Sequence, residues 1–238
     1  MFRLLENPVT EEFDAKSGIW QNKSISLILV VLVLGVTVLV PGVGVIGAFL
    51  VAFGAALLGR KVGSFREMGM RAPDSWPKLL GTTFVYGVVI QFAFSILIEP
   101  ILEKITGSAV DISVLDGIRG NFVNCLMMIA VGWSVGGFLE EFTFRGFVVT
   151  RVHKLLGSGP AAIWIAVLVA AVPFGIAHMY QGPAGMIGTG LIGFLFGVIY
   201  VVHGYNLWYP VFAHGFINTV AMILIYLDAD LGLSDFLF

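Results

Sequence analysis

Charged residues divide this chain into long uncharged stretches separated by short polar segments. No Asp, Glu, Lys or Arg occurs in 24–59, 79–98, 120–139 or 155–227, which are 36, 20, 20 and 73 residues long. A transmembrane helix needs about 20 predominantly apolar residues. The pattern therefore predicts an all-α protein, a polytopic transmembrane helix bundle of about seven spans.

Turn signals divide the longest stretches into single spans. Pro41-Gly42-Val43-Gly44 interrupts 24–59, and Gly182-Pro183 and His203-Gly204-Tyr205-Asn206 interrupt 155–227. We expect spans at about 24–41, 43–59, 79–98, 160–178, 184–202 and 207–227, and a long helical region over 120–156. The charged residues between them predict an interfacial connector over 60–78 and an acidic loop that carries Glu99, Glu103, Asp111 and Asp116.

The distribution of Lys and Arg predicts how the bundle is oriented. With 24–59 as a hairpin, the N-terminal segment, 60–78 and 145–157 share one side and hold three, five and three Lys and Arg residues, against two on the other side. Cytoplasmic segments of membrane proteins are enriched in these residues. We expect the N-terminus in the cytoplasm and the C-terminus outside.

The composition agrees with a protein immersed in lipid. Hydrophobic residues make up 58% of the 238 residues and charged residues only 12%, whereas soluble domains carry about 25% charged residues. These values exclude a soluble enzyme with a single anchor. A net charge of −2 without a basic patch argues against a nucleic-acid partner and leaves the lipid bilayer as the expected surroundings.

Polar residues inside apolar spans are candidate functional residues because charged groups are costly in lipid. Three clusters qualify, and they contain Glu140, Glu141 and Arg145, then His178, then His214 and Asn218. Carboxylates, imidazoles and an amide from different spans supply a base and polarising donors, which suits hydrolysis of a carbonyl compound. We expect Glu141 to pair with Arg145, four residues later, and to turn away from the cavity lined by the others.

The spacing EExxxR, FxxxH and HxxxN on successive spans resembles the CPBP family of intramembrane endopeptidases, which includes the enzymes that process prenylated CAAX proteins. The resemblance covers about 140–218, with a weaker echo in Glu67-Met68-Gly69-Met70-Arg71. It implies that Glu140 activates water with help from His178, and that His214 and Asn218 stabilise the oxyanion. Glu141 and Arg145 support them as an orienting ion pair.

This resemblance predicts the organisation and function of the chain. We expect a cytoplasmic N-terminal segment over 1–23, N-terminal transmembrane helices and a connector over 24–118, a catalytic transmembrane core over 119–227 and a tail over 228–238. The predicted function is an intramembrane endopeptidase that hydrolyses a peptide bond in a membrane-associated peptide or protein substrate.

Three alternatives remain open at the level of sequence. Glu140, His178 and His214 are also a set that binds zinc, although the HExxH spacing of zinc proteases is absent and we expect no cofactor. A catalytically silent binding, immunity or scaffold protein would use the same polar residues. A small-solute transporter is disfavoured because the chain has no internal repeat.

Overall fold

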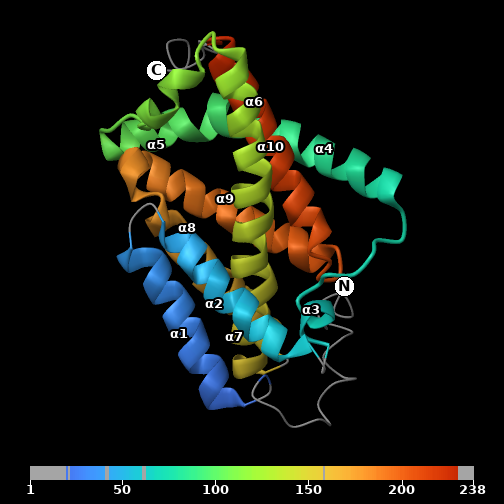
Figure 1. The fold of residues 1–238 in the computed structure, drawn as a ribbon. Helices are drawn as coiled ribbons and strands as arrows, with labels where there is room; N and C mark the ends of the chain where they lie inside the picture. The colour runs from blue at the N-terminus through green and yellow to red at the C-terminus, as the bar shows by residue number, and fades with distance from the viewer. Residues whose placement is uncertain (1–19, 21, 41–42, 61–62, 158, 230–238) are drawn as a thin grey trace.

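The computed structural model describes the chain apart from residues 1–19, 21, 41–42, 61–62, 158 and 230–238, and the described part is helical without a β-strand (Figure 1). The α-helices are α1 (Lys23–Leu39), α2 (Gly44–Leu58), α3 (Ser64–Glu67), α4 (Trp76–Ala93), α5 (Glu99–Thr106), α6 (Phe122–Val131), α7 (Thr150–Leu156), α8 (Pro160–Ala177), α9 (Gly182–Val202) and α10 (Trp208–Tyr226). Three π-helical segments (Phe94–Ile98, Gly132–Glu140 and Phe142–Val149) and two 3₁₀ segments (Ser113–Ile118 and Met179–Gln181) join some of them.

Seven of these helical stretches have the apolar character expected of membrane helices. Five are long enough to cross a membrane, namely Trp76–Thr106, Phe122–Leu156, Pro160–Ala177, Met179–Val202 and Trp208–Tyr226. Two shorter apolar helices, Lys23–Leu39 and Gly44–Leu58, complete the set. The protein is therefore an integral, multi-pass membrane protein, and the predicted bundle of about seven spans is confirmed.

The first two helices form the hairpin that the sequence predicts. The side chain of Asn22 caps α1 by accepting a hydrogen bond from the Ile25 N–H at 3.1 Å. Helix α2 begins at Gly44, where a Cβ atom would lie 2.6 Å from the Val36 carbonyl oxygen. Only glycine allows this close approach of the two helices. Pro41 and Gly42, which predicted the turn, lie outside the described residues.

The prediction of an acidic loop after residue 98 is wrong for the first part of that segment, which is helical. Glu99 and Glu103 lie within α5, which continues the helix that begins at Trp76. The π turn Phe94–Ile98 ends two residues before Pro100, which has no N–H to donate to the preceding turn. The charged residues therefore extend the helix beyond its apolar part, to a glycine end at Gly107 with φ of 68°.

One long helix positions most of the candidate chemistry. Residues Phe122–Leu156 form a continuous helical stretch that runs through the bundle in Figure 1, with α10 packed beside it. Its second half also packs against α8. Around this half lies an apolar core that includes the fully buried rings of Phe142 and Phe147. Side chains from α8 and α10 thus reach the same stretch of helix.

Candidate active site

The two adjacent glutamates lie where the long helix changes its winding. Glu140 is the last residue of the π segment Gly132–Glu140, and Glu141 directly precedes the π segment Phe142–Val149. π-Helical turns are rare and occur frequently at functional sites. Both carboxylates are buried, which makes this part of the helix a candidate functional site.

Glu141 and Arg145 form the expected ion pair. Arg145 Nη1 donates to Glu141 Oε1 at 2.9 Å, and the two side chains are 1% and 0% exposed. Arg145 Nη2 donates to the Gly193 carbonyl oxygen at 2.6 Å, and the guanidinium group lies 4.6 Å from the centre of the Phe174 ring. The ion pair, the carbonyl acceptor and the aromatic ring offset part of the cost of burying the arginine, whose Nε atom has no hydrogen-bond partner among the described residues.

Glu141 does not turn away from the other candidate residues, and that expectation is wrong. The same atom, Oε1, also accepts a hydrogen bond from His214 Nδ1 at 2.8 Å. A carboxylate oxygen has more than one acceptor site, so one oxygen serves both the arginine and the histidine. Glu141 therefore connects its own helix to α10.

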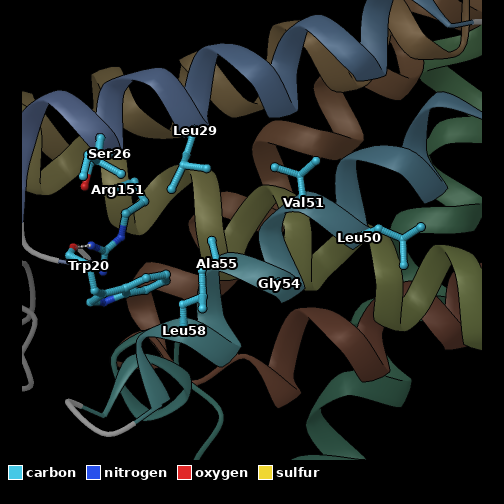
Figure 2. A pocket seen from close by; sticks show the side chains of 10 residues that line it. Trp20, Ser26, Leu29, Leu50, Val51, Gly54, Ala55, Leu58 and Arg151 are labelled. Atoms are coloured by element: carbon cyan, nitrogen blue, oxygen red, sulfur yellow. Dashed lines mark hydrogen bonds between the residues drawn. The ribbon is translucent and has the colours of Figure 1, made fainter. Parts of the chain in front are cut away.

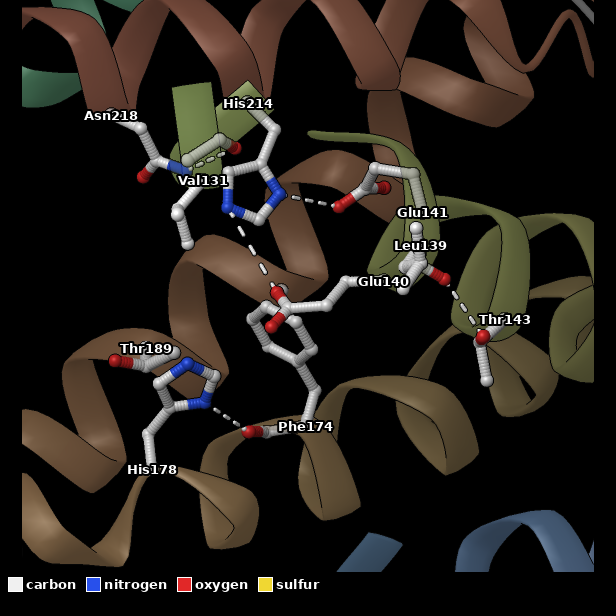
Figure 3. Close-up of polar contacts among 12 residues, drawn as sticks. Val131, Leu139, Glu140, Glu141, Thr143, Phe174, His178, Thr189, His214 and Asn218 are labelled. Carbon is white, nitrogen blue, oxygen red and sulfur yellow. Dashed lines mark hydrogen bonds and ion pairs between the residues drawn. The ribbon is translucent and has the colours of Figure 1, made fainter. Parts of the chain in front are cut away.

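His214 is oriented by this contact and by an aromatic neighbour. Its ring stacks on Phe196 with a centroid distance of 4.6 Å and an interplanar angle of 23°. With Nδ1 bound to Glu141, the other nitrogen, Nε2, lies 4.0 Å from Glu140 Oε2 (Figure 3). This separation is too long for a hydrogen bond, but it places the Glu140 carboxylate and the His214 imidazole next to each other.

His178 reaches the site from the end of α8. It is the residue that follows the helix, and its Nδ1 atom is 2.8 Å from the Phe174 carbonyl oxygen. A carbonyl oxygen only accepts, so Nδ1 carries a proton, and in a neutral ring Nε2 is then an acceptor. The Phe174 ring lies 5.0 Å from the His178 ring and 6.3 Å from the His214 ring. In Figure 3 the Glu140 carboxylate projects toward the space between the two imidazoles.

Asn218 lies one turn beyond His214 and is fixed to the long helix. Its Nδ2 atom donates to the Gly132 carbonyl oxygen at 2.9 Å. Gly136 faces the same amide, because a Cβ atom there would lie 2.5 Å from Asn218 Nδ2 and 3.1 Å from His214 Nε2. Sequence analysis missed this glycine, although its place one turn before Glu140 on the same span was a signal for it.

The described residues do not gather a complete metal site. No group of three His, Cys, Asp or Glu side chains within them is arranged to hold a metal ion. Glu140 and His214 approach each other, but His178 does not join them as a third ligand. The zinc set Glu140, His178 and His214 is therefore not assembled in this geometry, and metal dependence stays a question for a chelator experiment.

The candidate residues all lie in a segment with a recognisable family signature. Residues 122–220 match the family model described as Rce1-like, Type II CAAX prenyl endopeptidase Rce1-like. This segment belongs to the Rce1-like family. The Rce1-like segment contains every residue of the site, from Gly132 to Asn218. No curated protein and no solved structure matches the chain.

A second buried charge cluster connects the Rce1-like segment to the N-terminal part of the chain. Arg151 Nη2 donates to Glu67 Oε2 at 2.6 Å, and the Trp20 indole N–H and the Lys154 ammonium group also contact the Glu67 carboxylate. Burial alone would raise the pKa of Glu67, but the two cations outweigh it and hold the pKa below the usual 4.5. Sequence analysis noted Glu67 only as part of the weaker echo and missed this pairing.

Proposed function

We propose that the protein is a CAAX-type intramembrane endopeptidase that hydrolyses a peptide bond in a membrane-associated substrate. The observation that carries the proposal is the buried Glu140 carboxylate, which faces Nε2 of His214 at 4.0 Å within the Rce1-like segment. A carboxylate beside an oriented imidazole has the components for general-base hydrolysis.

The contacts of the two glutamates support different roles. Glu141 Oε1 is engaged by both Arg145 and His214. Among the described residues, none donates a hydrogen bond to Glu140, whose recorded partner is the imidazole 4.0 Å away. Glu140 is thus the carboxylate available to accept a proton from water, and Glu141 is the positioning residue.

His178 and Asn218 fit the two remaining roles, which are to orient the water and to stabilise the oxyanion. His178 has its Nδ1 proton engaged by the Phe174 carbonyl, so its Nε2 atom is an acceptor that helps Glu140 to orient water. Asn218 uses one amide N–H on the Gly132 carbonyl and keeps the other for an oxyanion. His214 Nε2 donates to the same oxyanion only when it also carries a proton.

The proposed reaction follows from these roles. The water oxygen attacks the peptide carbonyl carbon while Glu140 takes the water proton. The carbonyl oxygen becomes an oxyanion, which Asn218 and protonated His214 stabilise more strongly in a dry site than water would. The carbon–nitrogen bond then breaks, and Glu140 returns the proton to the leaving amine. Glu141 and Arg145 keep His214 in place throughout.

Purified protein with a panel of labelled peptides tests the proposal. The panel contains a prenylated CAAX-type peptide, the same peptide without the lipid, and a scrambled control. We expect cleavage of the prenylated peptide that persists in the presence of a chelator. No cleavage of any peptide would favour the silent binding protein, and loss with chelator that zinc restores would establish the metal enzyme. Reporter fusions at the two termini test the proposed orientation, with the N-terminus cytoplasmic.

A further inference from the structure

A pocket of about 290 Å³ lies between α1 and α2, and it shares no residue with the candidate active site (Figure 2). Its walls are mainly apolar side chains of the two helices. They are Ile25, Leu29, Leu50, Val51, Ala55 and Leu58, with Ser26 and Gly54 among them. Leu50 and Leu58 are also exposed on the outside of the bundle. The pocket is therefore an apolar space beside the lipid-facing surface.

Gly54 helps to keep this space open. A Cβ atom at Gly54 would meet no other atom within 4 Å. This glycine is not needed for close helix packing, in contrast to Gly44 on the same helix, whose Cβ would lie 2.6 Å from Val36 O. A larger side chain at position 54 therefore has room to enter the pocket without displacing the helices.

One end of the pocket is formed by Trp20 and Arg151. The Arg151 guanidinium lies 3.7 Å from the centre of the Trp20 ring, and its Nη1 donates to the Trp20 carbonyl oxygen at 2.6 Å. Its Nε atom is buried without a hydrogen-bond partner among the described residues. The Glu67 carboxylate is shared by Arg151 and Lys154, so this end of the pocket carries more positive than negative charge.

We propose that the pocket binds an acyl chain of an anionic phospholipid, with the headgroup beside this cationic end. Apolar walls open to lipid suit an acyl chain, and basic residues at the end of transmembrane helices bind anionic headgroups. Lys154 is 25% exposed and Arg151 only 2%, so Lys154 is the cation that reaches a phosphate.

Quenching of tryptophan fluorescence by brominated acyl chains tests this proposal. The full chain is reconstituted in phosphatidylcholine vesicles that contain a small fraction of either brominated phosphatidylglycerol or brominated phosphatidylcholine. The chain has five tryptophans, so the difference between wild type and Trp20→Phe isolates the emission of Trp20. We expect the anionic lipid to quench Trp20 at about one fifth of the concentration that the zwitterionic lipid requires, as one excess positive charge predicts.

A matched pair of glycine substitutions separates the pocket from general lipid contact. Gly54→Phe fills the pocket and should abolish the preference for the anionic lipid. Gly35→Phe on α1, where a Cβ atom also meets nothing within 4 Å, should retain it. Since Trp20→Phe removes a buried hydrogen bond, phosphatidylglycerol retained through detergent purification provides a second measurement that leaves Trp20 intact.

Three results would overturn the proposal. Equal quenching by the two lipids would mean ordinary contact with the bilayer. No quenching of Trp20 by either lipid would mean that protein closes the pocket. If Gly54→Phe kept the preference for the anionic lipid and retained as much phosphatidylglycerol as wild type, the lipid would bind outside this pocket. Each result is independent of peptidase activity.

Discussion

Glu141 holds His214 by its Nδ1 atom, at 2.8 Å. The same carboxylate oxygen is bound by Arg145 at 2.9 Å, and all three side chains are buried. An ionised carboxylate only accepts hydrogen bonds, so Nδ1 of His214 must carry a proton. The contact leaves Nε2, 4.0 Å from Glu140, as the nitrogen that faces the reaction.

The contact between Glu141 and His214 leads to a prediction about which histidine nitrogens carry protons. If His214 donates to an oxyanion, both of its nitrogens carry protons at the pH of activity. Selective ¹⁵N labelling of histidine gives only four imidazoles to resolve, and His214→Gln identifies the signal of His214. We expect two protonated nitrogens for His214 and a single protonated Nδ1 for His178. A His214 ring with bare Nε2 would leave Asn218 as the oxyanion donor and contradict the role given to His214.

Replacement of Glu141 should affect stability as well as turnover. Glu141→Gln leaves Arg145 buried without its counter-charge, and breaking a buried ion pair costs about 3 kcal/mol or more. We expect a lower thermal unfolding temperature in detergent and a lower rate of hydrolysis per folded molecule. Glu141→Asp, which retains the charge, is the control and should recover part of both. An unchanged unfolding temperature in Glu141→Gln would show that the pair does not stabilise the fold.

Gly136 should be required for activity because of its position against Asn218. Gly136→Ala places a Cβ atom 2.5 Å from Asn218 Nδ2 and displaces the amide. Loss of an oxyanion donor costs about 100- to 1000-fold in turnover, so we expect Gly136→Ala and Asn218→Ala to fall in that range. The control is Gly81→Ala on α4, where an added Cβ meets nothing within 4 Å. Equal activity of Gly136→Ala and the control Gly81→Ala would exclude this role for Gly136.

Much of the architecture was predictable because burial in lipid constrains sequence strongly. Charge-free stretches and turn signals predicted the hairpin and the spans, and lone polar residues within them indicated Glu140, His178 and His214. These predictions need only local composition and spacing. The predictions of the hairpin and of the spans therefore succeeded without knowledge of how the helices pack.

Features that depend on packing between distant segments were not predictable. Glu67 and Arg151 lie 84 residues apart, and nothing in the spacing relates them. The π turns around Glu140 do not follow from a helical period of 3.6 residues. Glu141 was placed by its spacing to Arg145 alone, so its second contact, with His214 on another helix, was missed.

The Glu67 cluster predicts how stability depends on pH. Its pKa lies below 4.5 in the folded protein because Arg151 and Lys154 outweigh the effect of burial. A group with a lowered pKa stabilises the fold fully above its unfolded pKa, and this contribution is lost as the pH falls through the folded value. We expect Glu67→Gln to be less stable than wild type at pH 7.

Thermal unfolding of both proteins between pH 7 and about pH 3 checks this expectation, because the window spans the usual carboxyl pKa. The difference between wild type and Glu67→Gln should shrink on acidification, mainly below pH 4.5. A difference that stays constant or grows would show that the ionised Glu67 does not stabilise the fold.

The most direct measurement is the hydrolysis rate of Glu140→Gln relative to wild type, per correctly folded molecule, on the peptide that the wild type cleaves. Glutamine keeps the size and polarity of the side chain but cannot take a proton from water. We predict that turnover collapses to the background level while yield and unfolding temperature remain close to those of wild type. Full activity in Glu140→Gln would contradict the assignment of Glu140 as the base.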